Sequence, residues 1–369
     1  MLSLTTTTAQ LTDFFERCLT SGVQSRLTTY EPGGIILTTF DANALWAYDI
    51  DRNRRYPLPN TAPCISNCHL SPDGEWVSYF NRVTREQHQM RLNGAETQAI
   101  YPDAAEVIWW SDNTLLVWTP NRDAYVIQEF STDQIETTAI ASDGIYSLQP
   151  NGDYGLSISQ DGEDFYRVLR QLETDDDLLL GADAPYFNAA AWSPDGEWLA
   201  FVGEGDYDET NRVSGAELYG IRPGIDENPT RWTNLHSIYG AVRVNDMRRD
   251  NLTWSPDGSK IAFWVIELLG SNPTGINRQA ILHIYDVNAD QLIAYCGFST
   301  PAHTPFSPRI VWSPESTNLA FSVPLPDHTG GNVLVALNTR NGIFTELTDG
   351  LFNGSAPSEL IGWGRLPDQ

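Results

Sequence analysis

Short apolar segments separated by tight polar turns recur along most of this sequence. Residues 68–80, 191–202 and 253–265 share one order: an apolar or aromatic run, the turn Ser-Pro-Asp-Gly, and a second apolar run. Proline fixes φ at the turn entry, aspartate accepts hydrogen bonds from the backbone ahead of it, and glycine takes a positive φ. The flanking β-branched and aromatic residues favour strands. Each copy therefore predicts a strand, a tight turn and a second strand.

Further copies of this unit predict a repeat fold. Residues 311–323 keep Ser-Pro and the apolar run, weaker copies occupy residues 107–118 and 147–159, and a last copy lies at residues 360–368. More strand-like sequence follows each hairpin, which gives about four strands per unit at a spacing of about 40–60 residues, as in propeller blades. The sequence therefore predicts an all-β fold, a single β-propeller most simply counted as seven four-stranded blades, with six or eight as alternatives.

The two ends of the repeat region complement each other. The last copy supplies only a first strand, at residues 359–363, whereas strands without such a partner lie at residues 34–40, 44–50 and 54–58. We expect N- and C-terminal strands to share one blade and close the ring, which leaves no free strand edge. The chain then divides into an N-terminal extension, residues 1–33, and a propeller, residues 34–369.

The N-terminal extension carries apolar residues at helical spacing. They follow threonines that can cap a helix and precede Gly22 as a stop signal, so we expect a short amphipathic helix. A helix this short must pack on the propeller or on a partner protein. The apolar positions are Leu11, Phe14, Phe15, Cys18 and Leu19.

The hairpin sequence resembles a known family. In residues 191–202 the Ser-Pro-Asp-Gly turn follows Trp and precedes Leu-Ala-Phe, and this pattern resembles the WD-repeat-like unit of TolB-like propellers. It is also similar to the propeller repeats of prolyl oligopeptidases. TolB resembles a six-bladed ring behind an α/β domain, and the residues before Gly34 are too few for that domain. The resemblance implies a propeller scaffold without a hydrolase domain.

Charge limits the partners. The chain has 48 acidic and 22 basic residues, a formal net charge of -26, so nucleic acids and anionic membrane surfaces are disfavoured. No apolar run approaches the ~18 residues that a membrane span needs, and the first residues do not resemble a signal peptide. The sequence as it stands therefore predicts a cytoplasmic protein without membrane insertion. A periplasmic or secreted protein is expected if a leader has been removed.

Motifs for chemistry are missing from the sequence. It contains no Gly-x-Ser-x-Gly, no His-Glu-x-x-His and no phosphate-binding Gly-Lys-Ser/Thr. Some pectin-degrading lyases resemble this fold and use a His-rich metal centre, but no motif here carries over residue by residue. Asp73, Asp195 and Asp257 each stand alone between Pro and Gly, which indicates turn stabilisation rather than calcium binding. No catalytic residue, metal ligand or cofactor is predicted.

Two residue types are assigned structural roles. Trp192, Trp254 and Trp312 recur at one repeat position, so we place them in the core between blades. Cys64 and Cys68 are close enough for a disulfide, but four scattered cysteines in a large chain do not resemble a disulfide framework.

Long insertions predict the binding surface. In a propeller the Ser-Pro turns crowd one face, and the connections between second and third strands and between blades leave on the other. Insertions on this second face cluster in blades five to seven and are rich in aromatic, Arg, His and Asn residues, as binding surfaces are. Loops that merely pack on one another are the alternative. The candidate binding residues are Tyr207, Asp208, Arg212, Trp232, His236, Tyr239, Arg243, Asp246, Arg248, Arg278, His303 and His328.

The sequence thus favours a non-catalytic binding scaffold that recognises a protein or a small ligand through the loop-rich face of blades five to seven. The alternative is a propeller hydrolase or lyase, with a metal or carboxylate/His site at the mouth of the axis. Several His and Asp residues converging in a cleft would favour the enzyme. An open aromatic patch would favour the scaffold.

Overall fold

A computed structural model of the chain shows an almost entirely β protein. It describes residues 13–16, 24–25, 32–41, 44–62, 68–101, 104–111, 114–121, 124–128, 136–140, 145–150, 152–162, 164–183, 189–203, 206–207, 213–214, 216–240, 242–244, 252–267, 279–301, 308–323, 333–347 and 359–366. Within these residues the only helix is α1 (Leu235–Tyr239), and the other regular elements are strands. The prediction of an all-β chain is confirmed.

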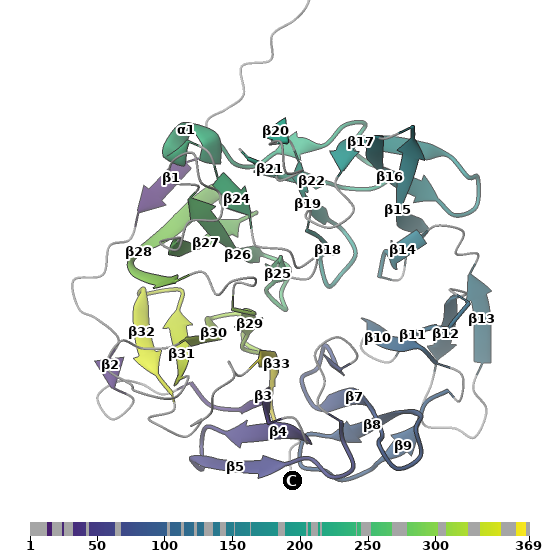
Figure 1. Cartoon of the computed structure of the whole chain (residues 1–369), viewed down its shortest axis with the longest axis vertical. Helices are drawn as coiled ribbons and strands as arrows, with labels where there is room; N and C mark the ends of the chain where they lie inside the picture. The colour runs from purple at the N-terminus through teal and green to yellow at the C-terminus, as the bar shows by residue number, and fades with distance from the viewer. Residues whose placement is uncertain are drawn as a thin grey trace, which may run out of the picture.

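The described strands form seven sheets of four or more strands, which Figure 1 shows arranged around a common centre. The closing sheet, which joins the two ends of the repeat region, has the order β33 (Glu359–Gly364), β3 (Ile35–Asp41), β4 (Ala44–Asp49), β5 (Arg54–Pro57). The next is β6 (His69–Leu70), β7 (Trp76–Phe80), β8 (Gln87–Arg91), β9 (Gln98–Ala99). The third is β10 (Glu106–Ser111), β11 (Thr114–Trp118), β12 (Ala124–Gln128), β13 (Glu136–Ile140).

The remaining sheets follow in chain order. The fourth is β14 (Ile145–Leu148), β15 (Tyr154–Asp161), β16 (Asp164–Gln171), β17 (Asp177–Asp183). The fifth is β18 (Ala190–Trp192), β19 (Leu199–Gly203), β22 (Glu217–Ile221), β23 (Thr230–Arg231). The sixth contains β24 (Val242–Val244), β25 (Thr253–Trp254), β26 (Lys260–Glu267), β27 (Gln279–Asp286), β28 (Gln291–Pro301). The seventh contains β29 (Val311–Trp312), β30 (Asn318–Val323), β31 (Val333–Asn338), β32 (Ile343–Glu346). A separate pair is β20 (Asp206–Tyr207), β21 (Val213–Ser214).

The closing sheet joins the first and last strands of the repeat region. β33 pairs antiparallel with β3, with Gly364 opposite Ile35 and Glu359 opposite Thr39. The indole N–H of Trp363 donates to the carbonyl of Gly33 at 3.0 Å, so a side-chain hydrogen bond also joins β33 to the residues just before β3. Strands from the two ends therefore share a sheet, as the repeat count predicts.

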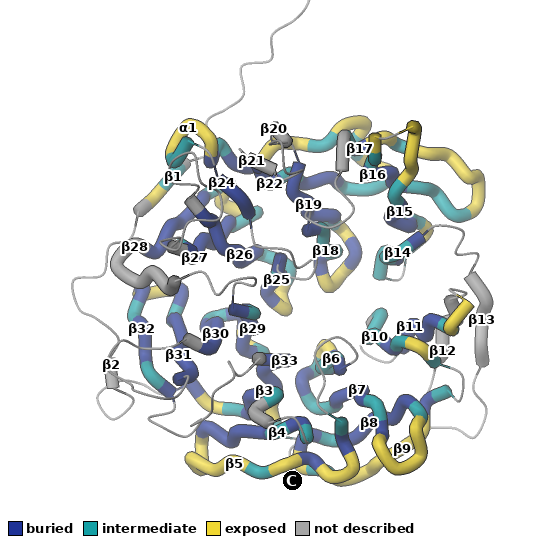
Figure 2. The backbone as a smooth tube through the Cα atoms, viewed as in Figure 1, coloured by how far each residue is buried: buried dark blue, intermediate teal, exposed yellow. Residues whose placement is uncertain are grey.

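The apolar core lies between neighbouring sheets. One cluster joins the sixth and seventh sheets through Trp264, Phe321 and Phe344, and another joins the fifth and sixth through Trp232 and Phe263. Figure 2 shows buried residues chiefly along the second and third strands of the sheets, intermediate burial along inner strands such as β18, and exposed residues along outer strands such as β5 and β9. Burial of these large side chains, at about 25 cal/mol per Å² of apolar surface, drives the packing of sheet against sheet.

The N-terminal extension departs from the prediction. Asp13–Glu16 form a strand, β1, which pairs in parallel with β28, so the predicted helix is wrong there. Gln24–Ser25 form β2, which pairs in parallel with β32. A short isolated helix is marginal in water, whereas the outer edge of a sheet offers ready backbone partners. Phe14 is half-buried and Phe15 exposed, the alternation of an edge strand.

Cys68 also departs from the prediction. It is 2% exposed and disulfide-bonded, although the scattered cysteines argued against a disulfide framework. Its partner's side chain lies outside the described residues. Counting and spacing of cysteines over the whole chain did not detect this bridge, whose described end lies just before β6.

Candidate binding surface

The Ser-Pro turns have one repeated geometry. Oδ1 of Asp195 accepts hydrogen bonds from the Ser193 hydroxyl and from the Glu197 backbone N–H, the latter at 3.0 Å. Gly196 follows with φ of 75°. The turns at Asp73 and Asp257 repeat both bonds. These aspartates stabilise turns, as predicted. For Asp257, burial alone would raise the pKa of the carboxyl, but hydrogen bonds from Ser255 and Ser259 bring that pKa below its ordinary value.

These turns crowd one side of the ring, which we call the hairpin face. Within each four-stranded sheet the strands are antiparallel, so the turns after the first and third strands leave on the same side. Connections after the second and fourth strands leave on the opposite, loop-rich side. Both pockets described below open among hairpin-face residues.

The first of these is the axial pocket, a cavity of about 420 Å³ at the centre of the ring. All seven sheets contribute residues to its wall. Five prolines of the turns after the inner strands surround it, and the only lining side chains among those described that can carry positive charge are His69 and Arg309. The wall is chiefly apolar, with tryptophans beside aliphatic residues and prolines. Its tryptophans are Trp109, Trp110, Trp192, Trp254, Trp312 and Trp363.

The tryptophans of the pocket also tie neighbouring sheets together. The indole N–H of Trp254 donates to the carbonyl of Ala191 at 3.0 Å, and that of Trp312 donates to the carbonyl of Thr253 at 2.8 Å. Trp254 and Trp312 are buried, which confirms the expected place between sheets, but Trp192 is only half-buried. Tryptophans at this repeat position therefore serve both the core and the pocket wall.

Acidic residues follow most of the prolines that line the axial pocket. In four turns the residue after the pocket-lining proline is an acid, from four different sheets: Asp73, Asp195, Asp257 and Glu315. Asp195, Asp257 and Glu315 are exposed. A rim of carboxylates around an aromatic wall creates a negative potential at the mouth, added to the charge of the whole chain.

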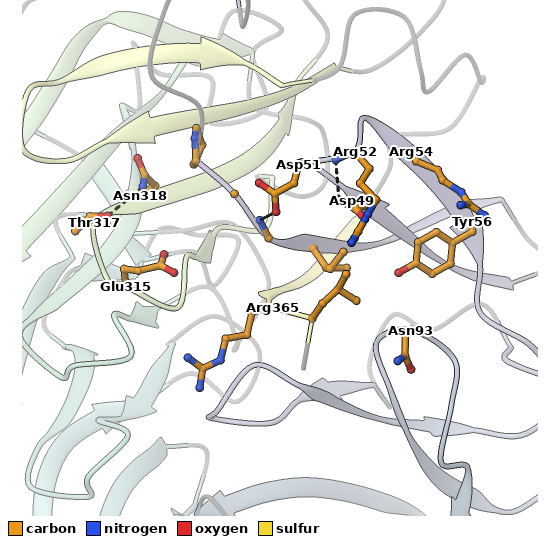
Figure 3. A pocket seen from close by; sticks show the side chains of 16 residues that line it. Asp49, Asp51, Arg52, Arg54, Tyr56, Asn93, Glu315, Thr317, Asn318 and Arg365 are labelled. Carbon is orange, nitrogen blue, oxygen red and sulfur yellow. Dashed lines mark hydrogen bonds and ion pairs between the residues drawn. The ribbon is translucent and has the colours of Figure 1, made fainter. Parts of the chain in front are cut away.

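The second cavity, the closing pocket, has about 970 Å³ and lies beside the closing sheet (Figure 3). In the other sheets a hairpin joins the first and second strands, but β33 and β3 come from opposite ends of the chain. Pro32–Ile35 and Gly364–Leu366 line the cavity where that hairpin would stand. Its other walls come from the β4–β5 turn and from the turn between β29 and β30.

Charged side chains line the closing pocket. Asp49, 3% exposed, accepts hydrogen bonds from the backbone N–H and the guanidinium of Arg52, at 2.9 and 2.8 Å. Asp51 accepts from the backbone N–H of Gly34 at 3.0 Å. The guanidinium pKa of Arg52 is raised by its bond to Asp49. Thus Asp51 holds the start of β3 in the closing sheet, whereas Asp49 is paired within the β4–β5 turn.

The structure places only part of the predicted site. Asp208, Arg212, Asp246, Arg248, Arg278, His303 and His328 lie outside the described residues, as does the side chain of Tyr207. Of the others, His236 is exposed on α1 and Tyr239 is half-buried on the same helix, while Arg243 is 8% exposed in β24. The described candidates therefore gather around α1.

Trp232 is not a surface residue. It is 4% exposed, stacks on Tyr285 with centroids 5.0 Å apart, and meets Trp198 and Trp254 edge-on. Gly220 makes room for it, because a Cβ there would lie 1.8 Å from the ring. Direct contact between Trp232 and a ligand is excluded by this burial.

Buried polar bonds anchor α1 to the scaffold. The Glu217 carboxylate, 1% exposed, accepts hydrogen bonds from the Thr233 hydroxyl and from the backbone N–H groups of Leu235 and His236, at 2.7, 2.7 and 2.9 Å. Arg231 donates to the same carboxylate at 2.8 Å. The first backbone donors of the helix are thereby satisfied.

A second anchor joins α1 to the sixth sheet. The hydroxyl of Tyr239 lies 3.0 Å from Nε2 of His283, whose Nδ1 lies 3.0 Å from the carbonyl of Ile281. His283 is fully buried and stacks on Phe263, and desolvation lowers its pKa to about 4. Because Nδ1 can only donate to the carbonyl, Nε2 accepts from Tyr239. The His283 side of this pair is fully buried, so the contact is a structural one.

No cluster of at least three His, Cys, Asp or Glu side chains suited to a metal ion occurs within the described residues. In the same part of the chain, no helix has the length and apolar character required to cross a membrane.

Comparison with known proteins identifies the fold but no family. No family model matches the sequence, and no curated protein sequence matches it. Among solved structures, oligogalacturonate lyase from Vibrio parahaemolyticus matches with a TM-score of 0.52 at 11% identity, over 86% of each chain. The fold is a β-propeller. A puromycin-hydrolysing peptidase from Mycobacterium tuberculosis matches at 0.52 and 11% identity, over 91% of this chain and 57% of that one.

TolB from Acinetobacter baumannii is also among the similar structures, with a TM-score of 0.42 and 15% identity over 91% of this chain and 81% of that one. Identities this low show the fold alone, and a fold by itself does not decide between an enzyme and a binding protein.

Neither pocket was predicted as the binding surface, because the long loops were expected to carry the binding residues. One signal pointed to the hairpin face. The tryptophans and prolines of the repeats stand at the inner ends of the strands, where a ring of blades brings them together around the axis.

Proposed function

We propose that the chain is a closed seven-bladed propeller, residues 34–369 with an N-terminal extension of residues 1–33, and acts as a non-catalytic binding scaffold. The seven sheets around one centre and the pairing of β33 with β3 support this closure. Its ligand is a cationic segment of a partner protein that enters the axial pocket from the hairpin face.

The aromatic wall of the axial pocket carries this proposal. Indole faces attract Lys, and Arg still more, through cation–π contacts worth about 0.5–2 kcal/mol each. Trp109, Trp110 and Trp192 are the half-buried tryptophans of that wall, so their surfaces are the ones a ligand can reach. The acidic rim and the net charge of -26 would steer a basic segment toward the mouth. An accessible aromatic surface favours a scaffold over an enzyme.

Fluorescence anisotropy with a labelled hexa-arginine peptide tests the proposal. Trp192→Ala and Trp110→Ala should each weaken binding about threefold to thirtyfold, the range of a lost cation–π contact. Trp46→Ala, which removes a half-buried indole from the closing sheet outside the pocket, should bind as the unmodified protein does. Equal affinity in all three variants would mean that the peptide binds through the overall negative charge of the protein and not at the axial pocket. The proposed axial site would then be refuted.

Two further variants, Asp257→Asn and Asp195→Asn, measure the contribution of the acidic rim to binding apart from that of the tryptophans in the wall. The amide oxygen can still accept the turn hydrogen bonds, so the fold is kept while one negative charge is lost. We expect a slower association rate with little change in the dissociation rate, as for rim charges generally. A loss of the folded state in these variants would show in the thermal unfolding midpoint.

A second proposal keeps the loop-rich face of blades five to seven as a partner surface. The rigid anchoring of α1 by Glu217 and His283 favours it, because α1 then presents His236 and the 37%-exposed Ile238 in fixed positions. Ile238→Ser should weaken capture of a partner that uses this face and leave hexa-arginine binding unchanged.

The disulfide of Cys68 supports a place in an oxidising compartment, such as a periplasm or the cell exterior. Structural disulfides persist there and are rare in reducing cytosol. This favours the exported alternative over the cytoplasmic one.

A further inference from the structure

The closing pocket carries charges of both signs, and only some of them are paired with each other. Its lining contains three acids and three arginines, whereas the whole chain has 48 acids against 22 bases. Asp49 and Arg52 neutralise each other. Among the residues that the structure describes, Arg54 and Glu315 take part in no ion pair, and Arg365 comes only within 3.8 Å of Glu75.

These side chains come from different walls of the closing pocket. Figure 3 shows Glu315 on the side of the β29–β30 turn, Arg54 on the side of β5, and Arg365 beyond the end of β33, nearer in this view to Glu315 than to Arg54. Arg365 is 57% exposed at its side chain, so its contact with Glu75 is a weak surface pair that leaves donors available. Asn93 adds an exposed amide from a neighbouring turn.

A ligand with charge of one sign would meet attraction from one wall and repulsion from another. A ligand with charges of both signs would be attracted by both walls. Guanidinium groups bind carboxylates through paired N–H donors, and the carboxylate of Glu315 suits an ammonium group. The cavity, at about 970 Å³, lies within the usual range of pockets that hold molecules larger than one amino acid.

We propose that the closing pocket binds a short peptide with free termini. Its carboxylate lies against Arg54 or Arg365, and its ammonium group lies against Glu315. This site is separate from the axial pocket of the proposed function, because the two pockets share no lining residue. Glu315 follows Pro314 of the axial pocket in the chain but lines the closing pocket.

Isothermal titration calorimetry with trialanine tests the site in the full chain. Four probes are compared: trialanine with free termini, its N-acetylated form, its C-amidated form, and the form blocked at both ends. We expect the free peptide to bind at least tenfold more tightly than the doubly blocked form, with each single block in between. Absence of binding heat for free trialanine to folded protein, or equal binding of all four forms, would overturn the proposal.

Three variants assign the two ends of the peptide. Glu315→Gln should remove the preference for a free amino terminus and keep the preference for a free carboxylate. Arg54→Gln and Arg365→Gln should weaken carboxylate recognition, at least one of them fivefold or more, and keep the amino-terminal preference. Arg82→Gln removes one exposed cation on the loop-rich face and serves as the matched control. Unchanged preferences in all three pocket variants would also overturn the site.

The same proteins are titrated with the labelled hexa-arginine peptide. Because Arg54 and Arg365 do not line the axial pocket, their variants should bind it at least as well as the unmodified protein. Failure of trialanine binding with intact hexa-arginine binding would refute the closing-pocket site alone. The reverse result would refute the axial site alone.

Discussion

Replacing Gly196 by alanine should destabilise the protein more than the same change at Gly258, although the two glycines occupy equivalent turns. Both have a positive φ, 75° and 69°, which costs an alanine about 1–2 kcal/mol. They differ in their surroundings. A Cβ on Gly196 would lie 2.4 Å from the carbonyl oxygen of Pro150, in the neighbouring sheet's turn, whereas on Gly258 the nearest atom is a carboxylate oxygen of Asp195 at 3.5 Å.

The close approach at Gly196 adds a second cost. A contact of 2.4 Å with a backbone atom forces one of the two turns to move, and overpacking of this kind costs about 1–3 kcal/mol. The expected losses of unfolding free energy are therefore about 2–5 kcal/mol for Gly196→Ala and about 1–2 kcal/mol for Gly258→Ala. Urea unfolding followed by tryptophan fluorescence, at unchanged slope, measures both. Equal losses would refute the reasoning that neighbouring turns pack backbone against backbone around the ring.

Three further outcomes follow from buried groups. Desolvation lowers the pKa of His283 to about 4 in the folded protein. Below pH ~6.5 the imidazole of His283 is therefore protonated in the unfolded chain but stays neutral in the folded protein until the pH reaches about 4. Stability should thus fall by about 3 kcal/mol between pH ~6.5 and pH ~4, and His283→Gln should lose this part of the pH slope in urea unfolding. Glu217→Gln should cost about 1.5–3 kcal/mol and speed hydrogen exchange of the Leu235 amide, whereas unchanged exchange would contradict its capping role. Reduction with dithiothreitol should lower the thermal midpoint if the Cys68 disulfide constrains the unfolded chain, and a midpoint unmoved by complete reduction would count against that.

Local turn chemistry made much of the fold predictable. Ser, Pro, Asp and Gly each have one physical task in the turn, and the hydrogen bonds of Asp195 and the positive φ of Gly196 match those tasks. The unpartnered strand sequences at the two ends likewise predicted the pairing of β3 with β33. These inferences needed only local preferences and a count of repeats.

Features that depend on neighbours distant in sequence were not predictable in the same way. Phe14 fits a helical pattern, but β28 offers it an open edge and a strand forms instead. Trp232 stands in a long insertion that resembled a binding loop, yet Gly220, on an adjacent strand, leaves room for its ring in the core. The closing pocket arises where the hairpin between first and second strands is replaced by two segments from opposite ends of the repeat region. The sequence of either segment alone does not indicate this pocket.

The pairing that completes the closing sheet sets an order of events during synthesis. Trp363 donates to the carbonyl of Gly33 across 330 residues of chain. At about 5–20 residues per second, the ribosome needs on the order of tens of seconds between these two positions. Throughout that interval the inner edge of β3, with Ile35 to Leu37 among its residues, has no β33 to pair with. A nascent chain would present this edge to other strands, so its yield in the cell should depend on chaperones that cover β3 until the last strand emerges.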